Sequence, residues 1–427
     1  MKTWTRTGSL ILAAAIVLAG CGNSGDANNG GEANNGAAAG NVENAANTGA
    51  VNAAAENAAA NTDQDAGAPA GDSGGETAAA DSAALIASVK ELVDGLKKSA
   101  ESGTVDWAAV EKSYNENVAA LVQARDAETE NQVHEQLTAA LAGGKEGTLA
   151  AGVVAQLYDK LLQKVAFLQM RHEFKEANEA FTDKAKVKAE LQEARAYYEG
   201  ILKGMVEKRD NAYETQLIAA IDGGFGEMEQ AADKGDNLAY NLGKQVVDKT
   251  LMKAFYLASG AEKGYGYKVE KAAKEGKTDD AKIGQAEGWA FFQSVKAYVE
   301  RYDADAAKLI EGQFDLSNDV KNVKGDEINK AYIRGFAAVA KGEYEESFEN
   351  WGKDKAVITA LEGALFIDVI KTDLAKALGG EDKAAALADN AQQLLDKVKA
   401  GDKAAAEELY KKVEADLNTL TAYGKAG

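Results

Sequence analysis

The chain has one cysteine and one proline among its 427 residues. Pro69 lies in a polar N-terminal stretch, so no proline interrupts residues 81–427. Proline breaks helices, whereas the Ala, Leu, Glu and Lys residues that dominate this part of the chain favour them. The sequence therefore predicts an all-α fold, a helical bundle with long, unkinked helices. Because a single cysteine cannot close an intramolecular disulfide, the fold must be stabilised by packing.

The sequence also lacks the familiar catalytic patterns. It has no Gly-x-Ser-x-Gly elbow, no His-Glu-x-x-His zinc motif and no complete Walker-type Gly-x-x-x-x-Gly-Lys-Ser/Thr motif. No Gly-x-Gly-x-x-Gly follows an expected strand. These absences argue against common nucleophilic, zinc-dependent and nucleotide-dependent enzymes, and leave catalysis by carboxylates alone open. The sequence requires no cofactor.

Positive charge is scarce. There are 48 Lys and Arg residues against 68 Asp and Glu, a formal net charge of −20. Such a surface repels nucleic acid and anionic lipid headgroups, so we expect no nucleic-acid partner. The simpler interpretation of the acidity is that it keeps an exported protein soluble.

The N-terminus has the order of a secretory signal. Lys2 and Arg6 precede an apolar run over residues 10–18, and Leu18-Ala19-Gly20-Cys21 follows. This ending resembles the lipobox of bacterial lipoproteins. The resemblance covers residues 1–21 and implies that residues 1–20 are removed and that Cys21 is diacylated. The protein would then be held by lipid on the outer face of a bacterial cell membrane, near a membrane or cell-wall protein partner, with no free thiol.

Residues 21–80 consist mostly of Ala, Gly, Asn, Ser, Thr and acidic residues and contain no aromatic side chain. A segment of this composition cannot bury enough apolar surface to offset the entropy of ordering. It therefore predicts a disordered tether, with a root-mean-square reach of about 40–45 Å for roughly 60 flexible residues.

Residues 81–427 are expected to form the helical domain. Asp81-Ser82 is a good N-cap for its first helix. Glycine-containing pairs predict further helix ends and restarts. These pairs are Gly143-Gly144, Gly223-Gly224, Gly235-Asp236, Gly325-Asp326, Gly379-Gly380 and Gly401-Asp402.

An internal similarity organises this domain. The stretch over residues 282–303 and the later stretch 357–375 align so that Glu287 meets Glu362 and Phe291 meets Phe366. Similar runs upstream begin at Asp159-Lys160, Asp248-Lys249 and Asn329-Lys330. The sequence predicts about three related helical units, over 146–230, 236–318 and 320–400, with 81–145 and 402–424 as caps.

The repeated glutamates are the main candidate site residues. A carboxylate on an apolar helix face is costly unless it is paired or protonated. Glu193 occupies the corresponding place in a degenerate first unit, and the candidate partners are lysines or an arginine at repeated positions. The candidates are Glu193, Glu287 and Glu362 with Lys160, Lys249 and Lys330, or with Lys164, Lys253 and Arg334. One hypothesis is a buried Glu–Lys bridge inside each unit. The other is convergence of the glutamates on a cation or a basic ligand.

Both histidines lie four residues from a glutamate. Glu130 with His134, and His172 with Glu176, would share a helical face. Such pairs occur in helical-bundle metal sites, but the carboxylate clustering of those sites is not visible here. Pairing on the helix surface is the favoured interpretation.

Two glycines and an apolar seam complete the repeat. Gly284 and Gly288 share a helical face and predict close packing of a neighbouring helix. Phe291, Val295, Tyr298 and Tyr302 continue that face and are expected in the core.

These observations favour a lipid-anchored extracytoplasmic protein that acts as a non-catalytic binding or interaction module. Capture of a cation or another small ligand for uptake would suit its location. The first alternative is a structural spacer of the cell envelope without a ligand. The second is an extracellular carboxylate-dependent enzyme.

Overall fold

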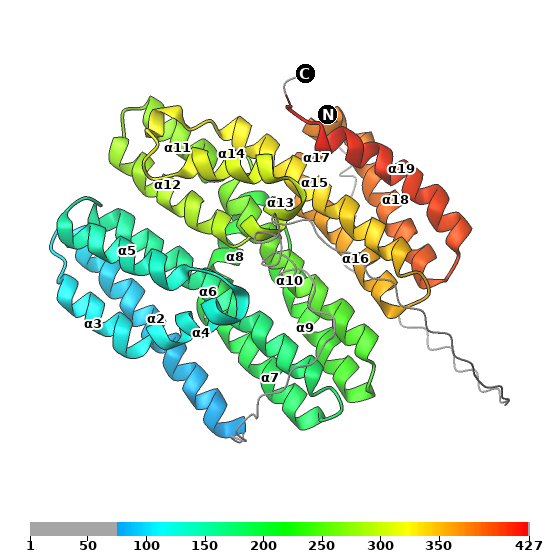
Figure 1. Ribbon diagram of the computed structural model, residues 1–427, viewed down its shortest axis with the longest axis horizontal. Helices are drawn as coiled ribbons and strands as arrows, with labels where there is room; N and C mark the ends of the chain where they lie inside the picture. Colours follow the sequence, from blue (N-terminus) through cyan, green and yellow to red (C-terminus); the bar gives the residue numbers. More distant parts are fainter. Residues whose placement is uncertain (1–74, 426–427) are drawn as a thin grey trace, which may run out of the picture. The chain divides into compact units, whose positions relative to one another are not determined.

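The computed structural model describes residues 75–425, and the side chains from Asp81 onward. This range consists of helices and connecting turns and contains no strand, which confirms the all-α prediction (Figure 1). Cys21, the expected leader 1–20 and the expected tether up to residue 74 lie outside the described residues. No helix of the described range is both long and apolar enough to span a bilayer.

The helices follow one another with short connections. Their bounds are α2 Gly75–Ser102, α3 Trp107–Asn117, α4 Ala119–Thr129, α5 Val133–Glu146, α6 Ala151–Glu179, α7 Lys184–Tyr197, the π-helical η1 Tyr198–Leu202, α8 Lys203–Tyr213, α9 Leu217–Lys234, α10 Asn237–Ser259, α11 Tyr265–Lys274, α12 Thr278–Gln293, α13 Lys296–Tyr302, α14 Ala304–Phe314, the 3₁₀ turn η2 Val320–Asn322, α15 Gly325–Glu349, α16 Asp354–Val369, α17 Lys371–Leu378, α18 Glu381–Lys399 and α19 Lys403–Thr421.

The first helix begins earlier than the sequence indicates. α2 starts at Gly75, within the segment expected to belong to the tether. Asp81 and Ser82 lie inside the helix and do not cap it. The Ser82 hydroxyl is buried and donates a hydrogen bond to the Glu193 carboxylate of α7, 2.7 Å away. Ser82, which local propensity assigns to a helix cap, therefore makes a tertiary contact between α2 and α7.

A long helix followed by an interrupted one recurs along the chain. α6, α10 and α15 are the long helices, and α7–η1–α8, α12–α13 and α16–α17 are the interrupted ones. The prediction of unkinked helices is wrong for the second group, although it contains no proline. The break residues Val295 and Ile370 are fully buried, so the chain changes direction while an apolar side chain stays in the core. The boundaries of three units stay a prediction.

The N-terminal segment, expected to be a cap, has the same order of helices as the first unit. It also contains the same kind of turn. α2 is long, and α3–α4 is interrupted at buried Val118. The carboxylates of Asp126 and Asp210 each accept hydrogen bonds from the first backbone N–H groups of the following helix, α5 or α9. Glu130 and Glu214, just before these helices, both have left-handed backbone conformations. The similarity therefore extends further toward the N-terminus than the sequence comparison indicates.

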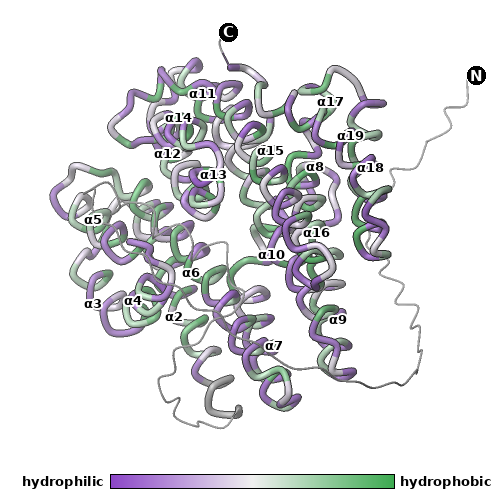
Figure 2. The backbone as a smooth tube through the Cα atoms, turned by 45° about the vertical axis from the view of Figure 1, so that its right-hand side comes forward, coloured by the Kyte–Doolittle hydropathy of each residue, from purple (hydrophilic) through white to green (hydrophobic). Residues whose placement is uncertain are grey.

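The core is centred on α10, which packs against α9, α12 and α16. Almost every side chain of α10 from Val246 to Ser259 is buried. Three of the four expected seam residues, Phe291, Val295 and Tyr298, are buried as predicted, whereas Tyr302 is only half-buried. Figure 2 shows hydrophilic and hydrophobic stretches alternating along the helices, as amphipathic helices require.

Two expected helix ends are interior positions at which helices approach closely. Gly143-Gly144 lies inside α5, and Gly223-Gly224 lies inside α9. A Cβ atom at Gly224 would meet the Gly243 carbonyl oxygen of α10 at 2.9 Å. Gly224 is needed because the neighbouring helix leaves no room for a side chain. The predicted packing role of Gly288 is also confirmed, since a Cβ there would overlap the ring of Phe314.

This contact gives a matched pair of substitutions. Gly224→Ala should lower the free energy of unfolding by roughly 1–3 kcal/mol, because α9 and α10 would have to separate. Gly223→Ala should raise it by up to about 1 kcal/mol, because this exposed helix position has open space and alanine favours helix. Urea unfolding measures both. Equal effects of the two substitutions would contradict the close crossing.

Candidate functional site

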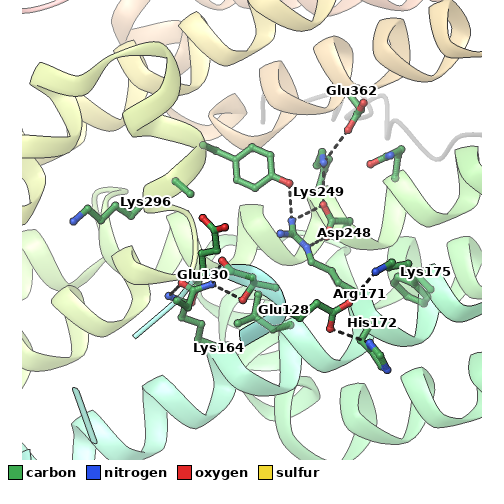
Figure 3. Close-up of a pocket in the computed structure, with 18 of the residues that line it drawn as sticks. Glu128, Glu130, Lys164, Arg171, His172, Lys175, Asp248, Lys249, Lys296 and Glu362 are labelled. Carbon is green, nitrogen blue, oxygen red and sulfur yellow. Dashed lines mark hydrogen bonds and ion pairs between the residues drawn. The ribbon is translucent and has the colours of Figure 1, made fainter. Parts of the chain in front are cut away.

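A polar cleft of about 610 Å³ lies where several helices meet (Figure 3). Its walls come from the α4–α5 turn, the second half of α6, the first half of α10, the α12–α13 break and α16, with single residues from α14 and α15. The interruption at Ser294–Val295 opens this space, because α13 leaves the direction of α12 at that point.

The cleft differs in charge from the rest of the acidic chain. Its lining contains as many Lys and Arg side chains as Asp and Glu side chains. They are Lys164, Arg171, Lys175, Lys244, Lys249, Lys296 and Lys355, against Glu128, Glu130, Asp248, Glu300, Glu311, Glu346 and Glu362. The lining is therefore formally neutral, in a chain of net charge −20.

One wall is a row of paired charges that joins α6, α10 and α16. Arg171 donates to both carboxylate oxygens of Asp248, at 2.6 and 2.9 Å. Lys249 lies 2.9 Å from Asp248 and 2.9 Å from Glu362. Arg171 also donates to the Tyr298 hydroxyl oxygen at 3.0 Å. Figure 3 shows Arg171, Asp248, Lys249 and Glu362 in one row, with Lys164 and Lys296 apart from it, to the left.

The charges of this row hold each other in the ionised form. Burial alone would raise the pKa of Asp248, but Arg171 and Lys249 lower it well below its usual range. Burial alone would lower the pKa of Lys249, but Asp248, Tyr298 and Glu362 raise it. Each member therefore depends on its neighbours, as buried ion pairs do.

A corresponding cluster joins α6 to α12. Lys160 lies 2.6 Å from Asp159 and 3.5 Å from Glu287. The Tyr265 hydroxyl donates to Glu287 at 2.6 Å, and Lys97 lies 2.6 Å from Asp159. The structure thus brings Lys160 to Glu287 as it brings Lys249 to Glu362. Both bridges connect different expected units, so the expectation of a bridge inside each unit is wrong.

Glu193 and Lys330 do not form a third bridge. Glu193 accepts the Ser82 hydrogen bond described above, and Lys330 lies 2.6 Å from Asp326 on its own helix. α7 packs against α2, α6 and α9, and Lys160 of α6 pairs with Asp159 and Glu287 and not with Glu193. Of the further cations considered, Lys253 lies 2.7 Å from Asp368, and Arg334 donates to the Tyr423 carbonyl oxygen at 2.9 Å.

Three of the four residues of the weak metal hypothesis have separate partners, and the two expected Glu–His pairs do not form. His134 lies 2.8 Å from the Tyr114 hydroxyl, and His172 lies 2.9 Å from Glu128. Glu176 pairs with Lys186 at 3.3 Å, and Glu130 ends its helix in a left-handed turn. Within residues 75–425, no three His, Cys, Asp or Glu side chains are placed to hold a metal ion.

Two lysines of the cleft stand out because no carboxylate in the described part of the chain pairs with them. Lys164 is 5% exposed, and its ammonium donates to the Asn131 side-chain oxygen at 2.6 Å. Burial lowers the pKa of Lys164 to about 8. Burial also lowers the pKa of Lys244, which has no ion-pair partner in the described part of the chain. Sequence reasoning considered Lys164 only as a glutamate partner and missed Lys244, which lies outside the repeated positions.

A buried carboxyl group on α15 lies close to the row. Burial, with repulsion from Glu362, raises the pKa of Glu343 to about 9, although Lys249 opposes this. Glu343 is therefore protonated near neutral pH, which avoids a second uncompensated carboxylate beside Glu362.

The bridge at Lys249 should be much stronger than the pair at Lys330. Lys249→Met removes the shared partner of two buried carboxylates and should lower the free energy of unfolding by about 3–5 kcal/mol. Lys330→Met breaks a half-exposed pair and should cost about 0–1 kcal/mol. Chemical denaturation of both variants measures the difference. Similar small losses would show that the buried row does not hold the helices together.

Glu343 should make stability depend on pH. Its folded-state pKa lies above the usual 4.5, so the folded protein keeps a proton that the unfolded chain releases. This contribution is complete below about pH 4.5 and is lost as the pH rises through about 9. Glu343→Gln should therefore be more stable relative to wild type at pH 8 than at pH 5. Glu345→Gln, at an exposed position of the same helix, is the control and should show no such change. Parallel pH profiles for wild type and Glu343→Gln would contradict the raised pKa.

No protein-family model matches the sequence, and no curated protein or solved structure is significantly similar to the chain. Function therefore has to be inferred from the residues of the cleft and from the N-terminal sequence.

Proposed function

We propose that this protein is a lipid-anchored extracytoplasmic binding protein that captures a small, polar, negatively charged ligand in the cleft, without catalysis. The observation that carries this proposal is that Lys164 and Lys244 line the cleft without a carboxylate partner among the described residues. A buried ammonium is costly when uncompensated, and an anionic ligand would offset that cost.

The paired glutamates support an anion rather than a cation. Glu287 and Glu362 suggested cation capture in the sequence, but lysines already neutralise them. A cation would have to displace Lys160 or Lys249 from a buried bridge. An anion needs no such displacement at Lys164 or Lys244.

The size and lining of the cleft suit a small molecule. Pockets for small ligands commonly enclose about 300–1,000 Å³, and this cleft has about 610 Å³. Its many charged and amide side chains favour a polar ligand with several hydrogen-bonding groups. Leu168, Ile358 and the ring of Phe174 offer the limited apolar contacts.

The expected lipid anchor and tether would connect capture to uptake. A lipid on Cys21 would keep the cleft within reach of a membrane protein, which raises the effective concentration of bound ligand near that partner. A capture protein for uptake benefits from this arrangement, because the ligand is released where it is used.

A structural spacer is the second candidate. Its favouring observation is that Glu287 and Glu362 have internal lysine partners, as a protein without a ligand requires. A spacer gives no reason for two lysines without a carboxylate in a cleft.

Native mass spectrometry of the exported protein, isolated under mild conditions, separates the two candidates. We expect a bound organic anion in wild type and its loss in a Lys164→Met, Lys244→Met double variant, with folding checked by circular dichroism. A ligand-free mass, together with an unchanged melting temperature across a panel of carboxylates and phosphate compounds, would overturn the binding proposal and favour the spacer.

A further inference from the structure

The repeated pattern places a lysine at equivalent positions of α10 and α6. In the described structure, only the lysine on α10 has a carboxylate partner. Lys253 on α10 lies 2.7 Å from Asp368 on α16. This bridge lies one to two helical turns beyond the Lys249–Glu362 bridge on the same two helices. The two helices are thus joined by successive Lys–carboxylate pairs.

The same alignment identifies the counterparts on α6 and α12. Aligning Asp159-Lys160 with Asp248-Lys249 places Lys164 opposite Lys253. Aligning Glu287 with Glu362 places Gln293 opposite Asp368. The equivalent of the Lys249–Glu362 bridge is present on α6 and α12, since Lys160 lies near Glu287. At the second, an uncharged amide stands where the other copy has a carboxylate.

Contacts on either side show that Lys164 faces the α12–α13 break. Earlier on α6, the Lys160 ammonium lies 5.4 Å from the centre of the Phe291 ring. Later on α6, Arg171 reaches the hydroxyl of Tyr298. The turn of α6 between them, which carries Lys164, therefore runs beside the residues between Phe291 and Tyr298. Lys164, Gln293 and Ser294 all line the cleft.

The neighbouring polar atoms are unused. Gln293 and Ser294 are each 8% exposed, and the Gln293 Nε2 and Ser294 Oγ atoms are buried without a hydrogen-bond partner in the described structure. Buried polar atoms are rarely left unpaired in native proteins. The amide nitrogen can only donate, and the hydroxyl can donate, so both fit an acceptor supplied by a ligand.

We propose that Lys164, Gln293 and Ser294 form an oxyanion subsite, in which a carboxylate or phosphate group of the ligand takes the place that Asp368 fills beside Lys253. The inference rests on the proposed function and specifies the chemistry of its ligand. Lys164 supplies the charge, and Gln293 and Ser294 supply neutral donors.

The other charges near Lys164 leave this role open. Asp126 of α4 attracts the Lys164 ammonium, and Lys296 of α13 repels it. Lys296 is itself neutralised by Glu311 of α14 at 2.7 Å. Asn131 supplies a neutral acceptor that holds the ammonium in place. An anion beside Lys164 would also stabilise its charged form, so binding should weaken as the pH rises above about 8.

The test introduces a carboxylate at position 293, the position equivalent to Asp368. Calorimetric titration of the exported protein at pH 7 with inorganic phosphate and, separately, with acetate measures the subsite directly, with sodium chloride at equal ionic strength as the reference. We expect wild type to bind at least one of the two anions. Gln293→Asp should bind it about tenfold or more weakly, because the introduced carboxylate would pair with Lys164. Asn117→Asp adds the same charge at an exposed position and should leave affinity unchanged.

The outcomes separate the subsite from the proposed function. Phosphate binding alone, or acetate binding alone, identifies which oxyanion the subsite accepts. Equal affinity of wild type and Gln293→Asp, or no binding of either anion by wild type, would overturn the subsite. In that case, a ligand found by native mass spectrometry in both wild type and Gln293→Asp would leave the binding function standing. Absence of any ligand, together with an unchanged melting temperature across the panel of carboxylates and phosphate compounds, would remove both proposals.

Discussion

Buried charge must be neutralised, and the arrangement of the central helices depends on how this chain does so. Asp159, Lys160 and Glu287 connect α6 with α12, and Asp248, Lys249 and Glu362 connect α10 with α16. A buried ion pair adds little net stability compared with apolar packing, but loss of one partner is costly. The bridges therefore tie α6 to α12 and α10 to α16, and each depends on all of its partners. The cleft lies beside the second of these bridges, and its wall is built from the same charges.

The fold class follows from the sequence because composition and apolar spacing act locally. The absence of proline after Pro69 and the helical spacing of apolar residues were sufficient for an all-α prediction. Helix ends were less predictable. Gly223-Gly224 indicates a helix end in isolation, but its glycines lie inside α9 because α10 crosses there. The interruptions at Val295 and Ile370 likewise depend on tertiary packing, since neither residue is a helix breaker.

The site was predictable only in part, for a related reason. The repeat in the sequence pointed to Glu287, Glu362, Lys160 and Lys249, because the pattern at these positions is duplicated. Which lysine meets which glutamate depends on the contact of α6 with α12 and of α10 with α16. The cleft itself involves Lys164, Gln293 and Lys244, where the pattern changes or is absent. The positions at which the similar segments agree form the bridges between helices. The position at which they differ, Gln293 in place of Asp368, marks the candidate binding group.

Anion binding in the cleft, as proposed, depends on Lys164 being a buried cation without a carboxylate partner among the described residues. The most direct test is the titration of the Lys164 side chain by nuclear magnetic resonance, with lysines labelled at Cε and Lys164→Met used for assignment. In the ligand-free protein we expect a pKa of about 8, because burial is not offset by a carboxylate. A pKa at or above the ordinary lysine value of 10.5 would show that the ammonium is already neutralised or solvated, and would contradict the account.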